Sequence, residues 1–192
     1  MTDAAIGLGQ IKASDPDFDV DSFLKQAGQA LFAVKSAIQE RETADIRDLV
    51  SDSVYDELRS DVMSLYTRGA VHYFDLLDIR QSTIEAAEHT PTGDHITVLF
   101  QCVAEQYTLA ETRGADAIQM PPLMPFSEYW TFSRPPGAAT LAERRPECPV
   151  CGAPIDIDTG RICRYCRTLM PPPRQQTGWT VVAITPAAQS TA

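Results

Sequence analysis

The sequence contains no run of about 18 apolar residues, the length that a helix needs to cross a bilayer. Residues 1–19 also lack the charged start and the long apolar stretch of a secretory leader. These two absences predict a cytoplasmic protein without a membrane-spanning segment. Peripheral contact with a membrane stays open.

Basic residues are few compared with acidic ones. The 192 residues include 16 Lys and Arg against 26 Asp and Glu, a formal net charge of −10. Such a charge disfavours binding to nucleic acid, which is held largely through its phosphates. Only residues 143–175 have an excess of Arg, a formal +2, and a thiolate metal centre in the same stretch would offset it. The charge therefore predicts that nucleic acid is not the partner.

Catalytic motifs are absent as well. No phosphate-binding loop, nucleophile elbow or H-x-x-x-H pair occurs in the sequence. His72 is expected at a junction between a helix and a strand, and His89 and His95 flank a predicted turn, so all three are more often solvated than catalytic. The sequence therefore predicts that the protein is not an enzyme. The residues that could serve as acid or base in a pocket are His72, Tyr73, Asp75, Asp78 and Glu128.

Cysteine is concentrated in one stretch, "ECPVCGAPIDIDTGRICRYC" (147–166), which holds two C-x-x-C pairs. Each such turn directs two sulfurs at one point, and four thiolates complete the tetrahedral shell that Zn²⁺ prefers. Rubredoxin-like iron and two separate redox dithiols are the alternatives. The fifth cysteine, Cys102, is predicted to be a buried apolar residue. We expect one structural zinc per chain, with no open coordination position, held by Cys148, Cys151, Cys163 and Cys166.

Apolar periodicity predicts three helices followed by strands. The first runs from Asp15-Pro16 to about Arg41, a short second one covers 43–50, and the third begins at 51–53 and stops near Gly69. Ser53 and Asp56 form a weak capping pair for the third helix. Strands, the first of them bulged, are expected at 76–89, 96–109, 126–133 and 179–184.

Helices that precede strands indicate an α+β fold. The domain is predicted over 15–184, with flexible ends at 1–14 and 185–192. About 44 residues separate the last two strands, and a structureless loop of that length is unusual. We therefore interpret 143–175 as a zinc-ribbon module inserted into a hairpin connection. This interpretation places Trp130 and Trp179 on neighbouring antiparallel strands.

Several motifs share a pattern with one known family. They are the stretch that opens "DPDFDVDSFLKQAGQALF", the following "LVSD" and "YDEL", the strand-like "DLLDIR" and the W-x-F-x-R strand "YWTFSR". Together these motifs resemble the Tim44-like domain family, named after a subunit of the mitochondrial protein-import motor. "CPVCGAP" is similar to an insertion in some bacterial relatives. The resemblance implies a cone-shaped, curved antiparallel sheet packed by N-terminal helices, as in the nuclear-transport-factor-2-like class.

The resemblance also implies a function. We expect no long N-terminal region of the kind that engages the chaperone and translocon, so import-motor activity is not carried over. A non-catalytic binding or adaptor protein is implied, docking a protein segment or lipid-like ligand in an apolar pocket lined by the sheet and the first helix. The alternatives are a small enzyme of the same fold class and nucleic-acid binding through the zinc ribbon. The residues recognised are packing residues: Phe23, Leu31, Tyr55, Leu58, Trp130, Phe132 and Trp179.

Overall fold

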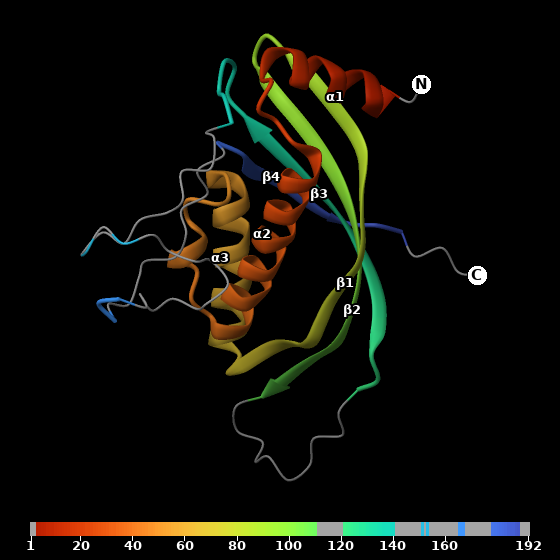
Figure 1. The fold of residues 1–192 in the computed structure, drawn as a ribbon. Coiled ribbons are helices and arrows are strands. Elements are labelled where there is room, and N and C mark those ends of the chain that lie inside the picture. The colour runs from red at the N-terminus through yellow and green to blue at the C-terminus, as the bar shows by residue number, and fades with distance from the viewer. Residues whose placement is uncertain are drawn as a thin grey trace.

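The protein has an α+β fold in which helices precede a four-stranded antiparallel sheet, in the order β1-β2-β3-β4. A computed structural model describes residues 3–110, 121–140, 151, 153, 165–167 and 178–188. The sheet is strongly curved, helices α2 and α3 lie against its concave side, and α1 lies across the far end of the β1–β2 hairpin (Figure 1). This architecture confirms the α+β prediction and is compatible with a nuclear-transport-factor-2-like fold.

Helix α1 (Asp3–Ser14) occupies the segment that was predicted to be a flexible end, so that prediction is wrong. Ile11 is fully buried, and α1 packs on β1. Gly7 makes this close packing feasible, since a Cβ at that position would lie 1.8 Å from the carbonyl oxygen of Ala87. The folded domain therefore includes α1 and does not begin at residue 15.

Helix α2 (Val20–Glu40) starts later than predicted, because Asp19 and not Asp15 is its N-cap. The Asp19 carboxylate accepts a hydrogen bond from the Ser22 amide at 2.8 Å. Asp15 is instead buried, and its carboxylate takes part in an ion pair described below. The short second helix is the 3-10 helix η1 (Ala44–Ile46), much shorter than the predicted segment.

Helix α3 (Asp52–Thr67) is capped by Ser51, whose side chain accepts from the Val54 amide. The predicted Ser53–Asp56 capping pair is therefore wrong by two residues. The prediction of a stop at Gly69 is confirmed: the helix ends at Thr67, and Gly69 has a φ of 57°, a conformation in which glycine has no steric cost.

The four predicted strands are all present, as β1 (Ala70–Thr90), β2 (Gly93–Ala110), β3 (Met124–Arg134) and β4 (Thr180–Pro186). β1 begins well before the predicted start at residue 76, and β4 extends two residues into the predicted flexible end. The pairing of β1 with β2 shifts register at three places, which confirms the bulged strand and accompanies its bend (Figure 1).

Strands β3 and β4 pair antiparallel, with Trp130 opposite Ile184, which confirms the prediction that they are neighbours. Trp179 immediately precedes β4 and is buried. The outer edge of β4 is covered where the Val181 amide donates to the Leu49 carbonyl at 2.9 Å and the Val181 carbonyl accepts from the Ser51 amide at 2.8 Å. This contact joins the start of α3 to the sheet.

Aromatic side chains fill much of the space between α2 and the concave side of the sheet. Phe23 makes edge contacts with Phe132 and Trp179, with ring centroids 5.4 and 5.1 Å apart, and Phe100 packs edge-on against Trp130. Burying each such side chain stabilises the fold by roughly 1.5–3 kcal/mol. Among the described helices, none is long and apolar enough to cross a membrane.

Candidate functional site

Two of the predicted zinc ligands, Cys148 and Cys163, lie outside the described residues. Of the other two, Cys151 is exposed and Cys166 is partly buried. Within the described part of the chain, no group of three or more His, Cys, Asp or Glu could hold a metal ion. The four-cysteine site therefore stays a prediction from its spacing.

The five candidate acids and bases are divided between the two faces of the sheet. Tyr73 stacks on Tyr107 with ring centroids 5.0 Å apart, and the Tyr107 hydroxyl donates to Asp75. Side chains alternate along a strand, so His72 faces the opposite way, toward the helices. Asp78 pairs with Arg80 at 3.0 Å, and both side chains are largely exposed. The structure does not assemble these residues into one catalytic group.

Glu128 is the candidate that lies inside the curved sheet, and its partner is Lys35 of α2. The Lys35 Nζ donates to Glu128 Oε1 at 2.6 Å, and Lys35 is only 7% exposed. Glu128 Oε2 accepts from the Trp130 indole nitrogen at 2.9 Å. The Lys35 ammonium also lies 4.9 Å from the ring centroid of Phe74 and 5.5 Å from that of Phe126. Both charges of the pair are thus compensated.

The buried pair affects two neighbouring titratable groups. Burial lowers the pKa of His72 below its ordinary value, and the nearby positive charge of Lys35 lowers it further. Burial raises the pKa of the Cys102 thiol to about 11, and the negative charge of Glu128 adds to this effect. At neutral pH we therefore expect a neutral imidazole and a protonated, inert thiol.

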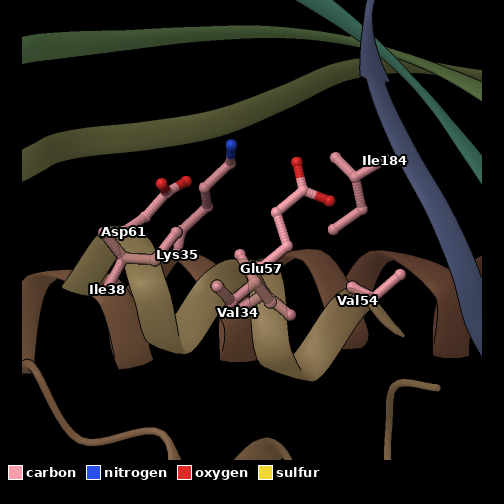
Figure 2. A pocket seen from close by; sticks show the side chains of 8 residues that line it. Val34, Lys35, Ile38, Val54, Glu57, Asp61 and Ile184 are labelled. Carbon is pink, nitrogen blue, oxygen red and sulfur yellow. The ribbon is translucent and has the colours of Figure 1, made fainter. Parts of the chain in front are cut away.

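A pocket of about 150 Å³ lies between α2, α3 and β4. Charged side chains from both helices join its lining, and Figure 2 shows Lys35, Glu57 and Asp61 directed toward the sheet. The predicted pocket was to be apolar and lined by the sheet and the first helix, which corresponds to α2. The pocket agrees in that α2 and β4 line it, and it differs in that α3 and three charged side chains line it as well. The walls of the pocket are aliphatic: Val34, Ile38, Val54, Leu58 and Ile184.

A second buried cation, Arg134, lies at the end of β3. Its Nε donates to Asp94 Oδ2 at 2.8 Å, and its Nη1 donates to Asp15 Oδ2 at 2.6 Å. The guanidinium lies over two rings that contact each other, 4.8 Å from the Trp179 centroid and 5.6 Å from the Phe18 centroid. Its Nη2 is buried without a hydrogen-bond partner in the described part of the chain. Arg134 is 1% exposed, so this arrangement, which we call the Arg134 cluster, is closed to solvent.

The Arg134 cluster also touches both sides of the connection between β3 and β4. Asp15 Oδ2 accepts from the Thr140 amide at 2.9 Å and from the Thr140 hydroxyl at 2.6 Å, and Trp179 stands just before β4. Burial of Asp15 opposes its ionisation, but hydrogen bonds from Thr140 and Arg134 outweigh burial and lower its pKa. The cluster therefore fixes where this connection leaves and re-enters the sheet.

The sequence contained signals for both buried cations. Lys35 lies one turn after Leu31 and beside Val34, on the apolar stripe of α2. Glu128 and Arg134 alternate with period two along the same face as Trp130 and so point into the core. A charged residue at a position where the apolar periodicity of its helix or strand points into the core is the pattern that could have identified these buried charges.

Comparison with known proteins supports the resemblance noted above. A family model for the Tim44-like domain matches residues 4–144, a range that includes both buried cations. A search of curated proteins gives no match. Because the family match covers most of the sequence and the described elements form the implied α+β fold, the chain belongs to the Tim44-like domain family.

Proposed function

We propose that this protein is a non-catalytic binding or adaptor protein that docks a protein segment or a lipid-like ligand. Membership of the Tim44-like family supports such a role. The observation that carries the proposal is the state of the buried cation that faces the pocket. Lys35 is paired with Glu128 at 2.6 Å. A general acid or base must instead be free to exchange a proton with a substrate.

The docking position that the geometry favours is the pocket between α2, α3 and β4. Its aliphatic walls suit an apolar group, and its volume of about 150 Å³ is below the range of about 300–1,000 Å³ that is usual for small-molecule sites. The pocket therefore fits a single side chain or the end of an acyl chain. A complete metabolite would need more room.

The zinc module belongs to the same proposal. We assign one structural zinc to Cys148, Cys151, Cys163 and Cys166, and we place the protein in the cytoplasm. Four thiolate ligands would leave no position for substrate, so the metal would stabilise its own segment without catalysing a reaction. The supporting observation is the paired C-x-x-C spacing of the sequence.

Cross-linking and capture from the source cell would test the proposal, with two variants beside the wild type. Leu58→Arg puts a positive charge on a wall of the pocket, and Gln101→Arg puts one on the exposed side of β2 as a control. We expect Leu58→Arg alone to lose the captured partner, and the purified partner to bind wild type with only a modest dependence on salt. Thermal unfolding of both variants checks that they fold.

Two results would contradict the proposal. Equal capture by all three proteins would exclude the pocket as the docking site. An affinity that collapses between low and moderate salt would instead indicate phosphate contacts, and hence nucleic acid held by the arginines of 143–175. A Cys148→Ser variant then shows whether the metal module takes part in the contact.

A further inference from the structure

The pocket between α2, α3 and β4 combines aliphatic walls with two acidic side chains. Glu57 and Asp61 are four residues apart on α3, so they lie on one face of the helix, one turn apart. Figure 2 shows both carboxylates on the sheet side of α3, close to the level of the Lys35 ammonium. A group that enters the pocket therefore meets apolar walls and two carboxylates together.

The charge of this pocket is unbalanced. Lys35 lines it, but its ammonium is already paired with Glu128 at 2.6 Å. Across the part of the chain that the structure describes, neither Glu57 nor Asp61 has an ion-pair or hydrogen-bond partner. Outside residues 143–175 the chain carries a formal −12, so the wider field also favours a positive ligand.

We propose that the pocket receives a lysine side chain from a docked protein segment. The aliphatic stem would pack against the pocket walls, and the ammonium would lie near Glu57 and Asp61. The volume of about 150 Å³ is below the range of about 300–1,000 Å³ that is usual for small-molecule sites, which suits a single side chain. This inference rests on the proposed docking function and specifies the chemistry of the partner.

A purely apolar occupant fits the same pocket less well. An acyl chain or a leucine side chain would remove water from the two carboxylates without supplying a positive charge, which is unfavourable. An arginine carries the charge on a broader planar group, for which the pocket offers less room. Charge and shape together therefore favour lysine.

Titration of the full chain with a short peptide tests the inference, with methyl NMR signals of Val34 and Ile184 as the readout. The probe is acetyl-Ala-Lys-Ala-amide, and its control is the same peptide with the lysine acetylated on Nζ. We expect the lysine peptide to shift both methyl signals and to bind about tenfold more tightly than the acetylated peptide, since acetylation removes the positive charge.

Variants of α3 distinguish binding in the pocket from a general attraction of the lysine peptide to the acidic surface. Glu57→Gln/Asp61→Asn should weaken binding of the lysine peptide about tenfold, whereas Asp56→Asn, an exposed change on the same helix outside the pocket, should leave binding unchanged. All three positions are exposed, so the variants should fold, and their spectra check this.

Three results would overturn the lysine site: no shift with the lysine peptide, equal affinity of the acetylated peptide, or unchanged affinity of the double variant. The proposed docking function is tested separately, because the titration uses no cellular partner. If the titration fails while Leu58→Arg still loses the captured partner, docking stands and its lysine specificity falls.

Discussion

Two buried cations on the inner side of the sheet differ in the number of their carboxylate partners and in what surrounds them. Arg134 makes ion pairs with Asp15 and Asp94 and lies over two neighbouring aromatic rings, with no exposure of its side chain. Its Nη2 has no hydrogen-bond partner in the described part of the chain. Lys35 meets one carboxylate, and the pocket that it lines also contains two carboxylates without partners among the described residues. One environment is closed, and the other can still accept a positive charge.

The chemistry of the two side chains explains the difference. A guanidinium is planar, presents five donors in fixed directions and can join several elements at once. Arg134 joins β2, β3 and the segment before α2 through its two carboxylate partners. An ammonium is a compact charge on a flexible stem, and Lys35 bridges only α2 and β3. The comparison assigns a structural role to the Arg134 cluster and a binding role to the pocket beside Lys35.

Replacement of Arg134 should have the largest effect on stability. Arg134→Met would leave Asp15 and Asp94 buried near each other without a cation, at a cost of about 3–5 kcal/mol in the free energy of unfolding. Urea denaturation measures this cost, and Arg80→Met, an exposed change on β1, serves as the control. A loss as small as that of the control would show that the cluster does not hold the fold.

Replacement of Lys35 should cost less, because Glu128 is nearer to solvent. Lys35→Met would leave Glu128 partly buried and unpaired, and we expect a loss of about 2–3 kcal/mol. The double variant Lys35→Met/Glu128→Gln should recover most of this loss, since the glutamine carbonyl could still accept from Trp130. No recovery in the double variant would mean that the ammonium stabilises the fold by contacts other than this pair.

Acid should weaken the Arg134 cluster through Asp15. The pKa of this carboxyl is lowered in the folded protein from its ordinary value of 3.8. Its contribution to stability is therefore complete above the ordinary value and is lost as the pH falls through the lower, folded-state pKa. Unfolding measured across this acid range should be less pH-dependent for Asp15→Asn than for wild type, while the exposed Asp17→Asn should match wild type.

Loss of the metal should have the smallest effect on the host domain. Contacts of Thr140 with Asp15 and of Trp179 with Arg134 hold both sides of the β3–β4 connection independently of zinc. Chelation or Cys148→Ser should therefore change the unfolding of the remaining domain by less than ~0.5 kcal/mol. Elemental analysis should find one zinc in wild type. Cooperative unfolding of the entire chain on chelation would contradict this account, and iron in place of zinc would overturn the metal assignment.

Periodicity was sufficient to predict most of the fold. The apolar stripe of α2 and the alternation along β2 and β3 are dictated by which face of each element is buried, so they can be read locally. Helix α1 was missed because its packing depends on Gly7 and on the backbone at Ala87, a contact between segments 80 residues apart in sequence. A glycine that permits close packing leaves no apolar stripe.

The buried charges were only partly predictable. The sequence places Lys35, Glu128 and Arg134 at inward positions. It does not show how they pair, because 93 residues separate Lys35 from Glu128 and 119 residues separate Arg134 from Asp15. The pocket was predicted beside the correct helix and the sheet, but its α3 wall and its charged lining were not predicted, because they depend on how elements far apart in sequence pack together. Periodicity predicts which side chains point inward and does not predict how they fill the space.

Hydrogen–deuterium exchange, measured with and without the purified partner, gives the most direct test of the two roles. It shows whether the pocket binds the partner while the Arg134 cluster only stabilises the fold. The account predicts slower exchange on binding in residues 34–38 and 54–61, around the pocket, and no change around Asp15 and Arg134. Glu57→Gln/Asp61→Asn should reduce the protection at the pocket. Protection confined to the Arg134 cluster, or no protection at the pocket when the partner is bound, would contradict the account.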